Sequence, residues 1–317
     1  MKQILTIKEL IDYAYNKYKS KKVITVDKEF IKNINYFNYR FDIYSLARAM
    51  KNKIKDEKIA IISENRYEFN VAYLANAIIN NKIFIIDYKL KAEEIKKVIQ
   101  KYEIKTIFIS NKSKEKILNI NEKINEKLNL INFDSNNEFP IIEYEKLINI
   151  GRYIENYSIE NIDNKENNSE NLIIVNLYGI KEYKQEEILN TAKLIAKNIK
   201  IRKRKAIKSE KNINTFYKVI IKIIIPLIDG LNIKFESNNE SSNIKYDIKI
   251  IEENKNNIEV SYKNIKYTIE GKNNNIVVKK VDNNLMRKEI KRYSPNFVLI
   301  KSHKSEKIKN DSKKALI

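Results

Sequence analysis

The stretch "KIAIISENRYEFNVAYLANAIINNKIFIIDYKLKAEEIKKVIQKYEIKTIFIS", residues 58–110, alternates short apolar runs with longer amphipathic segments. The apolar runs are residues 58–62, 83–87 and 106–110, and their unbroken apolar character is typical of strands that are buried on both faces. The two segments between them, 66–79 and 91–102, repeat apolar residues at a spacing near 3.6, which predicts helices. Such alternation predicts an α/β fold, with a parallel sheet flanked by helices on both faces.

The pattern extends on both sides of this stretch. Further helices are predicted over residues 6–20, 44–54, 113–128, 144–157, 185–199 and 216–230. Further strands are predicted at 130–133, from 171 onward and at 232–235, with a short hairpin formed by 21–26 and 36–42. From residue 236 the chain is rich in Asn and shows short alternating segments typical of antiparallel strands. We therefore predict an α/β domain over residues 1–235 and a small β-rich C-terminal part with a basic tail over residues 236–317.

Composition excludes several classes of protein. The chain has no cysteine and a single histidine, so disulfides, a thiolate nucleophile and multi-histidine metal sites are excluded. No apolar leader follows the first residues, and the longest apolar run is interrupted by Lys222. These features predict a cytoplasmic protein.

The net charge of +21, from 62 basic and 41 acidic residues, leaves two explanations open. A strongly basic balance favours contact with polyanions such as anionic lipid surfaces or nucleic acid. Alternatively, the abundance of Lys, Asn and Ile throughout the chain reflects a genome rich in A and T. The densest basic run, residues 197–211, lacks the aromatic side chains that stack on bases, so a solvated helix end is the favoured interpretation.

In chain order, these segments resemble the AMP-forming acyl-CoA synthetases of the adenylate-forming ligase superfamily, in particular the long-chain fatty acyl branch. Residues in register with this family's N-terminal motifs are Glu64, Asn65, Arg66, Tyr67, Tyr73, Ala75, Asp87, Leu90, Glu93 and Glu94. Residues 144–179, with Gly151 after a short helix, resemble the approach to the family's phosphate loop. The resemblance implies the fold of the family's N-terminal subdomain. It also implies an ancestral reaction that converts fatty acid, ATP and CoA to acyl-CoA, AMP and pyrophosphate.

The family's phosphate loop has the form TSGTTGxPKG and follows a buried strand, where this sequence reads "NLYGIKEYK", residues 176–184. Tyr178, Gly179, Lys181 and Lys184 occupy the position of that loop, but its threonines, serine and other glycines are absent. Glu182 adds a carboxylate, which is unfavourable beside a triphosphate. The family's Tyr-Gly-x-Thr-Glu motif, whose Glu holds Mg²⁺, has no counterpart, and we expect no metal site.

Three other residues complete the set of candidates. Lys307 stands where the family has the lysine that contacts the acyl-adenylate, although its surroundings read "SEK" in place of "TGK". His303 is predicted to be a surface residue of the basic tail. Glu93 and Glu94 begin a helix, where acidic side chains favour the helix dipole, and this is preferred over a role in acid–base catalysis.

Two functional interpretations remain. In the first, the chain is a truncated relative of a long-chain fatty acid–CoA ligase that has lost adenylation, a pseudoenzyme that retains no cofactor. ATP, Mg²⁺ and CoA would be needed only if the family activity survives. In the second, it is a non-catalytic basic protein that contacts an anionic membrane as a peripheral protein, a nucleic acid or a full-length synthetase. Fatty acid is a further candidate ligand, and nucleic acid is the least favoured of these partners.

Overall fold

The structure is a computed structural model, and the described part of the chain comprises several ranges. These are residues 4–27, 31–135, 141–154, 170–199, 206–208, 212–236, 248–253, 257–262, 265–272, 275–281 and 287–293. The chain divides into two compact units, Met1–Asp247 and Ile248–Ile317.

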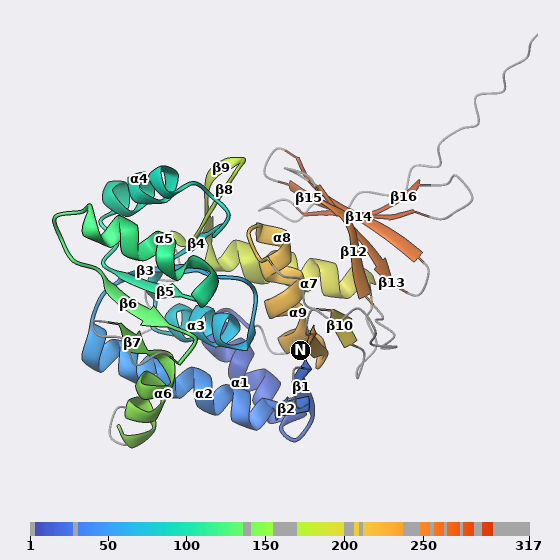
Figure 1. The fold of residues 1–317 in the computed structure, drawn as a ribbon. Coiled ribbons are helices and arrows are strands. Elements are labelled where there is room, and N and C mark those ends of the chain that lie inside the picture. The colour runs from blue at the N-terminus through green and yellow to red at the C-terminus, as the bar shows by residue number, and fades with distance from the viewer. Residues whose placement is uncertain are drawn as a thin grey trace, which may run out of the picture. The chain divides into compact units, whose positions relative to one another are not determined.

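The first unit contains a seven-stranded sheet in the order β7-β6-β5-β3-β4-β8-β9 (Figure 1). Its strands are β3 (Lys58–Ile62), β4 (Lys82–Ile86), β5 (Thr106–Ile109), β6 (Asn129–Asn132), β7 (Ile142–Glu143), β8 (Glu170–Asn176) and β9 (Gly179–Lys184). Every neighbouring pair is parallel except β8 with β9. The strands predicted from the apolar runs are therefore confirmed as one parallel set.

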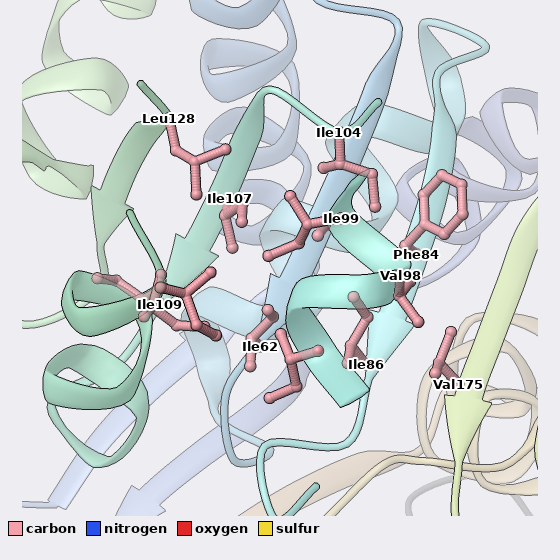
Figure 2. Packing of buried hydrophobic residues seen from close by; sticks show 14 of the residues in the cluster. Ile62, Phe84, Ile86, Val98, Ile99, Ile104, Ile107, Ile109, Leu128 and Val175 are labelled. Carbon is pink, nitrogen blue, oxygen red and sulfur yellow. The ribbon is translucent and has the colours of Figure 1, made fainter. Parts of the chain in front are cut away.

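Helices cover both faces of this sheet, as the unbroken apolar strands predict. The helices that pack on it are α3 (Tyr67–Ile78), α4 (Ala92–Tyr102), α5 (Asn111–Glu122) and α7 (Gln185–Ile199). On one face, Ile62, Ile86 and Ile109 pack with Val98 and Ile99 of α4 (Figure 2). The intervening strand residues point to the other face and are equally buried. The predicted α/β fold with a sheet covered on both faces is thus confirmed.

A second group of strands in the first unit contains β10 (Ala206–Lys208), β11 (Asn232–Glu236), β1 (Lys22–Asp27) and β2 (Ile31–Asn35). They are paired in that order, with β1 and β2 antiparallel and the other pairs parallel. The predicted hairpin exists, but its second strand is 31–35, and residues 36–42 belong to α2 (Tyr36–Ala49).

The helix at 36–42 forms because the apolar residues recur at helical spacing. Tyr36, Tyr39 and Ile43 are buried on one face, at intervals of three and four residues. Asn35 caps the helix, since its Oδ1 accepts a hydrogen bond of 2.8 Å from the N–H of Asn38. The alternation of aromatic and polar residues had suggested a strand, and that prediction is wrong.

The remaining helical segments of the first unit are α1 (Ile7–Tyr18), the π-helical turn η1 (Met50–Ile54), α6 (Tyr144–Tyr153), α8 (Phe216–Val219), the π-helical turn η4 (Ile220–Ile224) and α9 (Ile225–Asp229). The helix predicted over 216–230 is therefore present, with a π-helical turn at its centre. Helix α5 ends at Glu122, earlier than predicted. The side chain of Asn121 accepts a hydrogen bond of 2.9 Å from the N–H of Leu128, which turns the chain away from the helix. Residues 155–157, predicted to end α6, lie outside the described ranges.

The second unit contains an antiparallel series of strands, each paired with the next in sequence. The strands are β12 (Ile248–Glu253), β13 (Asn257–Tyr262), β14 (Ile265–Lys272), β15 (Asn275–Val281) and β16 (Arg287–Tyr293). The short antiparallel strands predicted for this part of the chain are confirmed.

Candidate functional site

The predicted phosphate-loop position is a tight hairpin. Strand β8 turns directly into β9, with Asn176 paired to Gly179, so that only Leu177 and Tyr178 connect the two strands. The candidate residues Gly179, Lys181 and Lys184 therefore lie in a strand and not in the expected loop. The strand predicted from residue 171 and the helix predicted over 185–199 are both present, as β8 and α7.

One backbone N–H of the turn, which a phosphate could otherwise use, is already engaged in a hydrogen bond. The N–H of Tyr178 donates to Oδ1 of Asn176 at 2.8 Å, and Nδ2 of Asn176 donates to the carbonyl of Asn214 at 2.7 Å. Gly179 adopts a φ of +112°, a conformation that favours glycine, with open space around it. The glycine thus serves the turn geometry.

The two candidate lysines of β9 do not converge on one point. Successive side chains of a strand point to opposite faces, so Lys181 and Lys184, three positions apart, lie on different sides of the sheet. Both are exposed. Between them, the carboxylate of Glu182 lies 3.4 Å from Nζ of Lys82. The four candidates are neighbours in the sequence, but the geometry of the strand places the two lysine charges on opposite faces of the sheet.

Polar side chains occupy the carboxyl ends of the parallel strands, where ligands of open α/β sheets usually bind. The chain passes from β3 to β4 on one side and then to β5 on the other, so the topological switch point lies between β3 and β5. Glu64 follows β3 and Ser110 follows β5, and the Ser110 hydroxyl donates to the Glu64 carboxylate at 2.6 Å. The pair bridges this edge between the two strands.

Arg66 ties further carboxylates to the same edge. Its Nε donates to Glu68 at 2.6 Å and its Nη1 donates to Asp134 at 2.6 Å, while Glu64 lies 3.9 Å away. Burial alone would lower the pKa of Arg66, but the carboxylates of Glu68 and Asp134 raise it overall. The guanidinium and carboxylates therefore satisfy one another. The resemblance placed Glu64 and Arg66 in register, but only the fold brings Asp134 to them.

A second group of mutually hydrogen-bonded polar side chains lies beside the hairpin, centred on Asp87, which follows β4. The buried carboxylate of Asp87 accepts hydrogen bonds from the side-chain amides of Asn212 at 3.0 Å and Asn214 at 2.6 Å. Its backbone N–H donates to the carbonyl of Val175 at 2.9 Å. Asp87 therefore fastens the segment before α8 to the end of β8. Sequence reasoning missed this role because the partner amides lie 125 and 127 positions further along the chain.

A hollow of about 660 Å³ lies at the amino ends of the parallel strands, opposite to their carboxyl ends, where β3, β5 and β6 begin. Its walls carry both signs of charge, with Nζ of Lys58 3.4 Å from Glu103 and Nζ of Lys105 3.4 Å from Glu126. This balance does not favour a polyphosphate, and the hollow is separated from the hairpin by the length of the strands.

The other candidates divide between placed and unplaced residues. Glu93 and Glu94 lie in the first turn of α4, at the start of a helix as predicted. The carboxylate of Glu94 also accepts a 2.9 Å hydrogen bond from the N–H of Lys91. Lys307 and His303 lie outside the described ranges, as does most of the basic run 197–211.

Across the described ranges, no group of three or more His, Cys, Asp or Glu side chains could hold a metal ion. No helix in the same ranges is both long and apolar enough to span a membrane.

Comparison with known proteins establishes the fold. No protein-family model and no curated protein matches the sequence. Among solved structures, the N-terminal domain of FACL13 from Mycobacterium tuberculosis is 13% identical, with a TM-score of 0.59 over 74% of this chain and 58% of that chain. A long-chain-fatty-acid-CoA ligase from Archaeoglobus fulgidus is 14% identical, with a TM-score of 0.59 over 73% of this chain and 47% of that one.

A third solved structure, of a luciferase-like enzyme, shares the same fold. The luciferase-like enzyme of the nonluminescent mealworm Zophobas morio is 12% identical, with a TM-score of 0.58 over 73% of this chain and 54% of that chain. The α/β part of this chain thus matches the N-terminal domain of acyl-CoA ligases. The chain spans about half the length of these neighbours.

Proposed function

We propose that this chain is a non-catalytic relative of long-chain fatty acid–CoA ligases, which keeps their N-terminal fold and does not activate fatty acids with ATP. The observation that supports the proposal best is the tight turn at Leu177 and Tyr178, at the position of the family's phosphate loop.

The chemistry of carboxylate activation explains why this turn matters. The reaction develops charge on phosphoryl oxygens, which enzymes stabilise with converging backbone N–H groups, a cation and Mg²⁺. In this hairpin the N–H of Tyr178 is bonded to Asn176, and Lys181 and Lys184 lie on opposite faces. These residues do not fit the triphosphate of ATP, so no step through ATP, Mg²⁺ or CoA is assigned to them.

Hydrogen bonds also close the carboxyl ends of β3 and β5, at the switch point. The Ser110 hydroxyl bonds to Glu64, and Arg66 is held by Glu68 and Asp134. Opening this edge for a nucleotide would break charge-assisted hydrogen bonds, each of which contributes about 1.5–3 kcal/mol. These side chains therefore have a structural role, in which they connect the segments that follow β3, β5 and β6.

A pyrophosphate-release assay tests the proposal. The purified full chain, incubated with Mg²⁺, ATP and fatty acids of several lengths, with and without CoA, is expected to release no pyrophosphate above background. A full-length acyl-CoA ligase in the same reaction mixture is the positive control. Release that requires both ATP and fatty acid would overturn the proposal. In that case the variants Lys307→Ala and Lys181→Ala would show whether either lysine takes part.

The alternative, a basic binding protein, is compatible with a non-catalytic chain. Its candidate partners are an anionic membrane surface, a full-length synthetase, nucleic acid or a fatty acid. One feature of the hairpin favours the first of these, because its turn exposes large apolar side chains to solvent.

A further inference from the structure

The β8–β9 turn exposes several large apolar side chains to solvent. Leu177 is 81% exposed and Tyr178 is 56% exposed, and Ile180, which follows the turn, is also exposed. Single exposed apolar residues are common, but a cluster at one turn indicates a surface that is covered by something else. Figure 1 shows this hairpin at an outer end of the sheet.

The shape and composition of the turn fit a lipid surface. Leucine enters hydrocarbon readily, and tyrosine is enriched at the boundary between lipid and water because its ring is apolar and its hydroxyl is polar. A protein interface of ordinary size buries roughly 800 Å² on each partner, which a two-residue turn does not offer. A lipid bilayer does not need a large complementary surface on the protein, because a small apolar turn can insert into it.

Charge complementarity indicates an anionic lipid surface. Residues 171–181 contain no acidic residue. Lys181 follows the turn at three residues, a distance of about 10 Å along a strand, and is exposed. On the other side, exposed Lys89 follows Asp87, whose N–H is bonded to Val175 directly below the turn. Lysines beside the turn would meet the lipid headgroups when the turn enters the interface.

We infer that the β8–β9 turn is a membrane-docking element, in which Leu177 and Tyr178 enter the headgroup region of an anionic bilayer and Lys181 and Lys89 contact its phosphates. The strand alternation that prevents two lysines from converging on a nucleotide is compatible with this role, since a flat surface has no single point of convergence. This inference does not rest on the loss of adenylation, and pyrophosphate release by the chain would leave it untouched.

The absence of tryptophan from the chain permits a direct test. The variant Tyr178→Trp carries a single tryptophan at the turn. The variant Tyr153→Trp carries one on α6, at a tyrosine that is 86% exposed, and is the matched control. With phosphatidylcholine vesicles that contain phosphatidylserine, the emission of Tyr178→Trp should shift to the blue and be quenched by brominated lipids. The emission of Tyr153→Trp should not change.

Three results would overturn the inference. The first is an unchanged emission from Tyr178→Trp in the presence of anionic vesicles. The second is an equal or larger response from Tyr153→Trp, which would mean that another face contacts the lipid. The third is a blue shift of Tyr178→Trp with rising protein concentration in the absence of vesicles, which would mean that a second copy of the chain covers the turn.

Vesicle co-sedimentation of the full chain separates the two contributions. Leu177→Ala with Tyr178→Ala should lower vesicle binding at least about tenfold at all salt concentrations, since the lost term is apolar. Lys89→Ala with Lys181→Ala should lower binding at low salt and flatten its salt dependence. The control Lys58→Ala with Lys105→Ala removes the same charge at the opposite edge of the sheet. An equal effect of the control pair would show that net charge alone drives binding and would overturn the inference.

Discussion

Gly151 lies in α6 where this helix meets α2, and it has no room for a side chain. The resemblance placed it after a short helix, but it lies inside α6. A Cβ at this position would overlap the backbone carbonyl of Ser45 in α2. Because the obstacle is backbone, it cannot rotate aside as a side chain would. The glycine therefore sets how closely the two helices approach.

Gly151→Ala should destabilise the chain by about 3 kcal/mol, even though alanine alone favours a helix over glycine by about 1 kcal/mol. The comparison variant is Gly179→Ala, which has open space but a φ of +112°. It should lose only about 1–2 kcal/mol. Urea unfolding monitored by circular dichroism measures both. A Gly151→Ala loss no larger than that of Gly179→Ala would contradict the close contact.

Asp229, at the end of α9, is a half-buried acid in an unfavourable place. Among the described residues its Oδ2 has no hydrogen-bond partner, and burial raises its pKa to about 6 although nearby Lys17 lowers it in part. The fold therefore favours the protonated acid. Its contribution to stability is full below the unfolded pKa of about 4 and is lost as the pH rises through about 6.

Asp229→Asn should raise the free energy of unfolding at pH 7 by about 1 kcal/mol, because it removes a partly buried charge at constant size. At pH 4 the variant and the original chain should be nearly equal, since Asp229 is then protonated in the folded state. Urea unfolding at several pH values between 4 and 8 measures the difference. A difference that does not change with pH would show that burial does not control this group.

At the scale of elements, β8 and β9 differ sharply although they are neighbours. Strand β8 pairs with β4 on one side and β9 on the other, and its apolar residues are buried. Strand β9 is the edge of the sheet and is largely exposed. Its lysines at positions 181 and 184 are typical of an edge that avoids further strand pairing.

Substitutions of one isoleucine on each strand can test this difference in burial. Ile174→Ala on β8 removes a side chain that is 2% exposed and should cost about 2–5 kcal/mol. Ile180→Ala on β9 removes one that is 38% exposed and should cost less than about 1 kcal/mol. Chemical denaturation of both variants measures the difference. Similar losses would mean that β9 is not the edge of the sheet.

For the whole molecule, the charge of +21 acts on stability as well as on binding. Like charges repel one another more in the compact state than in the unfolded chain, and salt screens this repulsion over a length of about 10 Å at 0.1 M. The same screening weakens attraction to anionic lipid. Salt should therefore move folding stability and vesicle binding in opposite directions.

The melting temperature should rise by several degrees when sodium chloride is raised from about 0.02 M to about 0.3 M at pH 7. The control is the same titration near pH 9.6, the isoelectric point, where the effect should nearly vanish. Differential scanning calorimetry measures both. A salt effect of equal size at the two pH values would show that repulsion among the charges is not its cause.

The sequence by itself determined the α/β class and the position of most strands and helices. Strands buried on both faces require unbroken apolar runs, and helices on the sheet require apolar residues near every 3.6 positions, so both are visible locally. Segments 58–62, 66–79 and 91–102 could be predicted for this reason. The order of these segments also indicated the ligase fold.

Only the tertiary structure decided the packing partners of the helix at residues 36–42 and the nature of the candidate site. The Tyr36 hydroxyl donates to the carbonyls of Pro226 and Leu231, about 190 positions away, and no local pattern contains that information. Likewise, residues 179–184 become a strand because they pair with β8, and Asp134 joins Arg66 because β3 and β6 end at the same edge. The turn's residues were visible in the sequence, but their exposure, and with it the surface proposed for lipid, depends on contacts between segments that are distant along the chain.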